Sequence, residues 1–262
     1  MLPCQGVENT MRRRAVLLLL ALAQPLPPGA AAEDKTASFA IDWAGFQVGV
    51  VDLRLDVDAT AYSLSWRGRT LGWFGALFPF ETDGAAAGRV HDTDYRPTRF
   101  AGRSSWRDGE RRWRVEFAAN GRAAIVEVPA EDLTEREPVP RELQIGPDPA
   151  SLALTAIRRA APGLRLSARG FDGRRAFAFD LACAEASAAA GELACSIRSE
   201  LLAGASRRWR EGSRGDGRRD PVTVWLRRGE DGRLWPARLE ASSRFGTITA
   251  RLVAPQRPPD AQ

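Results

Sequence analysis

Apolar and polar residues alternate with a period of two along most of this chain, which is typical of β-strands with one buried and one solvent-exposed face. The clearest stretch covers residues 51–58, which read Val51, Asp52, Leu53, Arg54, Leu55, Asp56, Val57 and Asp58. Tyr62, Leu64 and Trp66 continue the alternation, and the short link at residues 58–60 predicts a hairpin. The pattern therefore predicts antiparallel strands.

The same alternation recurs as far as residue 252 and predicts about eleven strands in all. Turn pairs with a second-position glycine separate many of them, at residues 108–109, 120–121, 172–173 and 231–232, so hairpin connections are expected. The apolar positions that mark the other strands are Phe39, Ile41 and Trp43; Trp113, Val115 and Phe117; Phe177, Phe179 and Leu181; Leu193, Cys195 and Ile197; Val222, Val224 and Leu226; Trp235, Ala237 and Leu239; and Ile248, Ala250 and Leu252.

One segment, residues 148–161, follows a helical pattern instead. Asp148 can cap the helix, Pro149 suits its first turn, and Arg158 and Arg159 complement the negative end of its dipole. Its apolar residues fall on one stripe, so the helix is expected to pack on a face of the sheet.

These elements predict a mainly β fold, in which a curled antiparallel sheet, half-barrel or β-spiral holds one packed helix. Curling or closure is expected because a flat open sheet of this size leaves exposed edges. Residues 33–255 are expected to form a single β domain of two β-halves, joined by a linker and helix at residues 129–163. Residues 256–262 are expected to be a disordered tail.

The first 32 residues resemble an export signal. Arg12, Arg13 and Arg14 precede an apolar run at residues 15–23, and small residues follow at 30–32, so cleavage is expected after Ala32. Residues 1–10 lack this pattern and lie before a second methionine, which makes them a candidate start-site artefact. The apolar run is far shorter than the ~20 residues that cross a bilayer, and no later stretch is long enough, so no membrane-spanning segment is expected.

The cysteines predict a disulfide, and the net charge of the exported chain is small. Only Cys183 and Cys195 remain after the predicted cleavage, and two cysteines in an exported chain predict one structural disulfide. Loss of three arginines and one glutamate with residues 1–32 lowers the formal net charge from +5 to +3, which is nearly balanced.

The sequence identifies no catalytic residues, no metal site and no cofactor. His91 is the only histidine and sits in the polar stretch at residues 90–94, which favours an exposed structural role. One histidine and two bridged cysteines do not make the usual zinc sites. The Arg-rich segment at residues 207–219 is interrupted by acids and glycines, so a solvated loop is favoured and no nucleic acid is expected. Paired carboxylates of a hydrolase remain an alternative, because their separation in space is invisible in a sequence.

The least ordinary stretch is residues 71–80, which is apolar on both parities and contains glycine and proline. Two interpretations remain open. It is either an element buried on both sides, or the lining or lid of an apolar ligand cavity. The aromatic residues proposed for such a cavity are Trp66, Trp73, Phe74, Phe78, Phe80, Trp106 and Trp113.

Several short motifs occur in a recognisable order: Gly45-Phe46-Gln47-Val48-Gly49, Tyr62-Ser63-Leu64, Tyr95-Arg96-Pro97, Asp148-Pro149 with Ser151, Trp235-Pro236-Ala237-Arg238-Leu239-Glu240, and Arg244-Phe245-Gly246. Their order resembles a bacterial family of exported proteins, domain of unknown function 3108. The resemblance implies a periplasmic β-cup, similar in architecture to envelope lipoprotein carriers in which a curled sheet partly wraps a helix. It implies no catalytic residues.

Together these observations suggest a periplasmic protein that maintains the cell envelope by binding an apolar or amphipathic ligand, such as a lipid or lipoprotein. A structural partner of another envelope protein is the first alternative, and it predicts an exposed apolar patch in place of a cavity. The envelope hydrolase with two carboxylates is the second.

Overall fold

A computed structural model describes residues 33–187, 191–207, 220–243 and 246–253 of the chain. The predicted leader, the predicted tail and most of the Arg-rich segment lie outside the described residues.

Within the described residues, thirteen strands form a single antiparallel sheet. Its order is β7-β6-β5-β4-β3-β2-β1-β13-β12-β11-β10-β9-β8. Strands that follow one another in the chain pair with each other, except β7 and β8, which form the two edges of the sheet. In addition, β1 pairs with β13. The strands are β1 (Glu33–Trp43), β2 (Phe46–Val57), β3 (Ala61–Thr70), β4 (Phe80–His91), β5 (Asp94–Trp106), β6 (Gly109–Phe117), β7 (Ala123–Glu127), β8 (Arg165–Phe171), β9 (Ala176–Ser187), β10 (Glu192–Ala203), β11 (Val222–Arg228), β12 (Leu234–Ser243) and β13 (Gly246–Val253).

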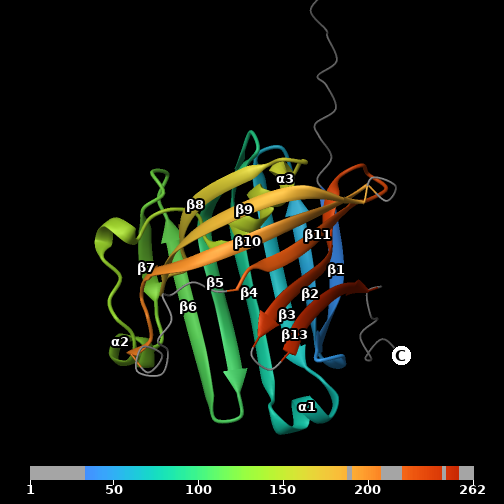
Figure 1. Cartoon of the computed structure of the whole chain (residues 1–262). Coiled ribbons are helices and arrows are strands. Elements are labelled where there is room, and N and C mark those ends of the chain that lie inside the picture. Colours follow the sequence, from blue (N-terminus) through green and yellow to red (C-terminus); the bar gives the residue numbers. More distant parts are fainter. Residues whose placement is uncertain (1–32, 188–190, 208–219, 244–245, 254–262) are drawn as a thin grey trace, which may run out of the picture. The chain divides into compact units, whose positions relative to one another are not determined.

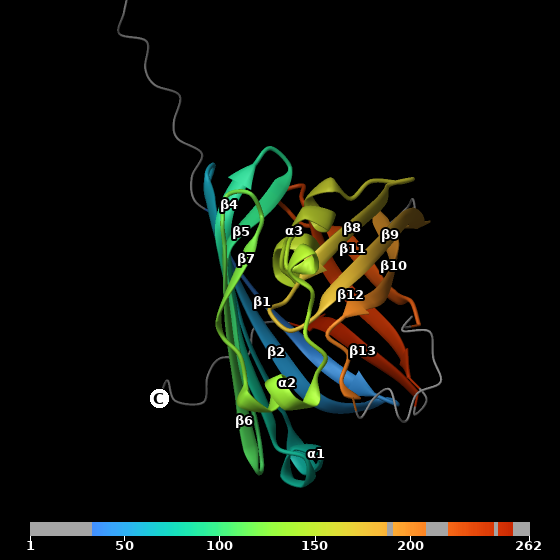
Figure 2. The same cartoon turned by 90° about the vertical axis from the view of Figure 1, so that its left-hand side faces the viewer.

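The sheet curls into a nearly closed barrel. Figure 2 shows the strands before the helical connection on one side and those after it on the other, with α3 (Pro149–Arg159) between them. The predicted mainly β fold is confirmed. The predicted hairpin at residues 58–60 is also confirmed, because Asp58 Oδ1 accepts hydrogen bonds from the backbone N–H groups of Thr60 (2.7 Å) and Ala61 (2.8 Å).

Strands β4 and β5 carry glycine at positions in register with large apolar side chains of their neighbours, so their own sequence shows a weaker alternation and the predicted number of strands is too low. Trp66, Gly84, Gly102 and Trp113 are register partners in a row across β3, β4, β5 and β6. A Cβ at Gly84 would lie 2.2 Å from the Trp66 ring, and one at Gly102 would lie 2.4 Å from the Trp113 ring. The two indoles thus occupy the space that the glycines leave free.

Helix α3 begins as predicted. The carboxylate of Asp148 accepts hydrogen bonds from the backbone N–H groups of Ala150 (2.8 Å) and Ser151 (3.1 Å). Ser151 also donates its hydroxyl to Asp148, and its oxygen lies 2.5 Å from the hydroxyl of Tyr62 on β3. Burial raises the pKa of Asp148 and raises that of Tyr62 well above its ordinary range. This buried chain of polar groups fixes the helix to the first half of the sheet.

In the described part of the chain, three further helical segments accompany α3, whereas the sequence predicts only one helix. Each is a single turn or two, too short to show a clear period. They are α1 (Gly72–Leu77), α2 (Ala130–Glu135) and the 3₁₀ turn η1 (Arg141–Leu143).

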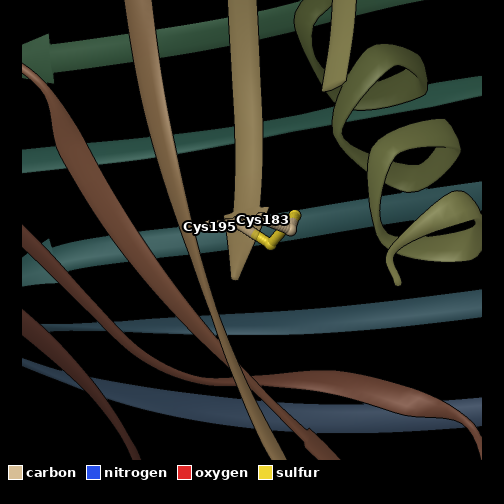
Figure 3. Close-up of a disulfide and its surroundings, with 2 residues drawn as sticks. All are labelled: Cys183 and Cys195. Atoms are coloured by element: carbon tan, nitrogen blue, oxygen red, sulfur yellow. A yellow bond between two sulfur atoms is a disulfide. The ribbon is translucent and has the colours of Figure 1, made fainter. Parts of the chain in front are cut away.

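The predicted disulfide is confirmed. Cys183 on β9 and Cys195 on β10 are direct register partners with a Cα–Cα distance of 4.0 Å, and Figure 3 shows the bond between their strands. Both side chains are buried in an apolar cluster with Ala156 of α3. The bond therefore lies in the core of the second half of the sheet.

Candidate ligand-binding site

The apolar stretch at residues 71–80 lies at one end of the sheet, where helix α1 projects beyond the strands (Figures 1 and 2). Trp73 is 62% exposed and Phe78 is 60% exposed, so the expectation of an element buried on both sides is wrong. The hydroxyl of Thr70 closes this connection, because it donates to the carbonyl of Phe78 (3.0 Å) and accepts from the N–H of Phe80 (3.0 Å). The loop is thus pinned at its base, and its apolar side chains project from the end of the sheet.

Other exposed apolar residues surround α1. Phe46 begins β2, Trp106 ends β5 and Ile248 lies near the start of β13. Because the strands are antiparallel, all three residues lie at the same end of the sheet. We call this set the apolar rim; its members are Phe46, Trp73, Leu77, Phe78, Phe80, Trp106 and Ile248. Large apolar side chains that gather at one end of a protein mark an interaction site more often than single exposed ones do.

A pocket of about 500 Å³ opens beside the rim, and we call it the end pocket. It is lined by Phe80, Ser104, Trp106, Arg111, Trp113 and Arg174. The first five come from neighbouring strands β4, β5 and β6, whereas Arg174 reaches it from the turn between β8 and β9. The pocket is therefore built from both halves of the sheet.

The structure brings together three of the seven aromatic residues proposed from the sequence as cavity lining. Phe80, Trp106 and Trp113 line the end pocket. Trp66 instead packs on Phe100 at a ring distance of 5.8 Å, against the main core. The other three, Trp73, Phe74 and Phe78, contact one another in and beside α1. Whether the end pocket holds a ligand stays a prediction.

An ion-pair cluster adjoins the end pocket through Arg174. Asp132 of α2 is buried and accepts hydrogen bonds from Nε of Arg136 (2.9 Å) and from both Nε and Nη2 of Arg174. Burial alone would raise the pKa of Asp132, but the hydrogen bonds and charges of Arg174 and Arg136 outweigh it and hold the pKa below its usual value. Burial, helped by the charge of Arg174, lowers the pKa of Arg136. The carboxylate is thus ionised and shared by two cations.

Arg111 is the second arginine that lines the pocket. Its guanidinium lies over the Trp106 ring at 5.1 Å, and its Nη2 is 3.8 Å from a carboxylate oxygen of Glu135. Its Nε is buried and has no hydrogen-bond partner among the described residues. The sequence pattern contains a signal for this residue, because Arg111 shares the inward parity of Trp113 and breaks the rule that charges occupy the outer positions. Arg174 carries no such signal, because only the fold brings its turn to β6.

A second hollow lies beside α3. This groove of about 1120 Å³ runs between the β4–β5 turn, the β6–β7 turn and β8, and its apolar surface includes Tyr95, Phe117 and Leu152. His91 lies at its edge, exposed, with Nδ1 3.3 Å from a carboxylate oxygen of Asp92. The exposed position predicted for this histidine is confirmed.

Each buried acid among the described residues has either an arginine or a neutral hydrogen-bond donor as its partner. Asp42 binds Arg251 at 2.7 Å, Asp172 binds Arg175 at 2.7 Å, and Asp132 and Asp148 are bound as described above. In the same described part of the chain, no cluster of three or more histidine, cysteine or acidic side chains suits a metal ion. Nor does any helix there have the length and apolarity needed to span a bilayer.

Comparison with known proteins places the chain. A family model described as "Protein of unknown function (DUF3108)" matches residues 38–253, and the chain belongs to this family. No curated protein matches it. Among solved structures, it is similar to a β-barrel-like protein of domain of unknown function DUF1849 from Brucella abortus. The two share 10% sequence identity and a TM-score of 0.47, over 84% of this chain and 95% of that one.

Proposed function

We propose that this DUF3108 protein binds apolar or amphipathic molecules outside the cytoplasm and thereby serves the maintenance of the cell envelope. The observation that carries the proposal is the junction of the end pocket with the apolar rim. Aromatic side chains that face water at the mouth of a pocket leave apolar surface for a ligand to cover, and each fully buried one contributes roughly 1.5–3 kcal/mol.

The composition of the pocket also suits this class of ligand. Binding sites for small molecules are mostly apolar, with a few polar groups that fix orientation. Here Phe80, Trp106 and Trp113 supply the apolar walls, whereas Arg111 and Arg174 supply the polar groups.

Two features support a location outside the cytoplasm. The disulfide between Cys183 and Cys195 is consistent with an oxidising compartment outside the cytoplasm. The n-region and h-region pattern at residues 12–23 supports export in the sequence itself. We propose the periplasm as this compartment.

Binding of a neutral apolar probe tests the function. We expect the fluorescence of N-phenyl-1-naphthylamine to rise in a saturable manner with the purified protein and to be reversed by dodecanol. Trp106→Ala should lower the affinity for both ligands by about tenfold, because it removes an aromatic wall of the pocket. Trp225→Ala is the matched control, since Trp225 packs under Arg238 away from the pocket and should leave binding unchanged. Absence of saturable binding, or equal affinity in Trp106→Ala and the wild type, would overturn the proposal.

A structural partner of another envelope protein is the second candidate. It is favoured by the part of the apolar rim that lies outside the pocket, on α1, where Trp73 and Leu77 face solvent. A Trp73→Ser variant that keeps probe affinity but no longer co-purifies with a defined envelope protein would favour this alternative.

A further inference from the structure

The charged side chains that line the end pocket are all positive. Its six lining residues include two arginines and no acid. Asp172, in the same turn as Arg174, is paired with Arg175. Two acids of α2 (Ala130–Glu135) lie beside the pocket arginines. Asp132 is shared between Arg136 and Arg174, so one negative charge offsets two positive charges. Glu135 is the other acid of the cluster, and it lies 3.8 Å from Arg111. Among these described side chains, three arginines therefore face two acids, which leaves one positive charge without a counter-charge beside the pocket.

Arg111 is where that charge is least satisfied. The distance of 3.8 Å to Glu135 exceeds the range of a hydrogen bond. The buried Nε has no hydrogen-bond partner among the described residues. A guanidinium carries five N–H donors in a planar fork, and a buried donor without an acceptor costs free energy. An oxyanion beside Arg111 would supply the missing acceptor.

The apolar surroundings strengthen this preference. Trp106 stacks on the guanidinium of Arg111, and Phe80 is the register partner of Trp106 on β4. Hydrogen bonds to charged groups are stronger where aromatic side chains exclude water. The walls that hold the cation in place are also the walls that an alkyl chain would cover, so charge and apolar surface are presented to a single ligand.

We propose that the end pocket recognises the monoanionic head group of an amphiphile, a carboxylate or a phosphodiester, through Arg111, with its alkyl chain against Phe80, Trp106 and Trp113. This inference rests on the proposed function and deepens it, because it names the class of ligand. A monoanion matches the single uncompensated charge.

The test compares each anionic amphiphile with a neutral one that has the same chains. Dodecanoate and dodecanol form one pair, and dioctanoyl-phosphatidylglycerol and dioctanoylglycerol form the other. All four compete with N-phenyl-1-naphthylamine on the wild type, Arg111→Met and Arg111→Lys. Methionine keeps much of the apolar length of arginine without its charge, and lysine keeps the charge. Arg112→Met is the matched control, because Arg112 is the next residue on β6, points to the other face and pairs with Glu110 at 2.5 Å. Far-UV circular dichroism confirms that each variant folds.

We expect the wild type to bind dodecanoate about tenfold to a hundredfold more tightly than dodecanol, the range of a charge-assisted hydrogen bond. Arg111→Met should abolish that preference with little change for dodecanol, Arg111→Lys should restore much of it, and Arg112→Met should keep it. A larger preference for the phosphatidylglycerol over dioctanoylglycerol than for dodecanoate over dodecanol would identify a phosphodiester as the head group, and the reverse order a carboxylate.

Each contrary result is distinct. If the wild type binds neither anionic ligand more tightly than its neutral counterpart, or if a folded Arg111→Met keeps the preference, the head-group inference fails while the proposed function stands. If no ligand displaces the probe, the proposed function itself fails. Because the wild-type preference is measured first, the inference is tested even where a variant does not fold.

Discussion

Replacement of Asp132 by asparagine is the most informative single perturbation of this structure. The change keeps the shape of the side chain and removes its charge. It leaves Arg136 and Arg174, whose side chains are only 18% and 13% exposed, without their shared counter-ion. Breaking a buried ion pair from one side costs about 3–5 kcal/mol, because the remaining charge stays out of water. We expect Asp132→Asn to lose about 3 kcal/mol of the free energy of unfolding, since both cations keep some access to solvent.

The pH dependence of this loss has a definite sign. The pKa of Asp132 is lower in the folded chain than in the unfolded chain, where it is about 3.9. The carboxylate therefore stabilises the fold fully above its unfolded pKa and loses this effect as pH falls through the folded pKa. The difference between the wild type and Asp132→Asn should be constant near neutral pH and shrink below about pH 4.

Urea unfolding, followed by tryptophan fluorescence with the disulfide intact, measures the effect. A loss of 3 kcal/mol corresponds to a fall of about 6–12 °C in Tm for a domain of this size. Asp83→Asn is the matched control, because Asp83 also accepts two hydrogen bonds from one arginine, Arg103, but lies at the surface, where water screens the pair. An equal effect of the two substitutions, or a loss in Asp132→Asn that does not change down to pH 3, would refute the reasoning.

Three further predictions follow from individual contacts. Joint replacement of Cys183 and Cys195 by alanine should cost about 3 kcal/mol and lower Tm without changing the far-UV spectrum, because the loop that the bond closes is short and both sites are apolar; an unchanged Tm would count against a structural role. Gly102→Ala should destabilise by about 1–3 kcal/mol and weaken probe binding, because the new Cβ would displace the Trp113 ring, and unchanged values for both would show that the ring has room to move. Trp73→Ser should change stability by less than about 0.5 kcal/mol in the same unfolding assay, because the indole is exposed; a larger loss would mean that α1 is part of the core.

The fold class was accessible from the sequence because most strands have one wet and one buried face. Residues 51–58 illustrate this, since each charged side chain falls on the outer parity of β2. Helix α3 was accessible for a similar local reason, because Asp148 caps the helix and Pro149 begins it. Strands β4 and β5 were harder to predict, because Gly84 and Gly102 are small in order to fit indole rings from neighbouring strands. The size of such residues is set by partners that the local sequence does not contain.

The candidate site was only partly accessible for the same reason. Residues 71–80 are apolar on both parities, which locally resembles a buried element. Whether such a stretch is buried depends on what covers it, and at the end of a sheet no described neighbour covers Trp73 and Phe78. The polar half of the end pocket combines Arg111 with Arg174, two residues 63 positions apart whose meeting requires the sheet to curl. Periodicity predicts the parity of Arg111 but not the second arginine of the pocket.

The position of the end pocket follows from the way in which the sheet ends. Strands β7 and β8 have no ladder between them, so hydrogen bonds of the sheet do not close the gap. Side chains and single backbone contacts take that role near α2. Asp132 binds Arg174 from the β8–β9 turn, Arg136 donates to the carbonyl of Gly204 at 3.0 Å, and the N–H of Glu137 donates to the carbonyl of Ala205 at 3.0 Å. A contact made by a few side chains leaves more unpaired polar surface than a ladder does, and here that surface is cationic. The curled sheet thus concentrates positive charge beside aromatic walls where its two halves meet, and this combination is what an anionic amphiphile requires.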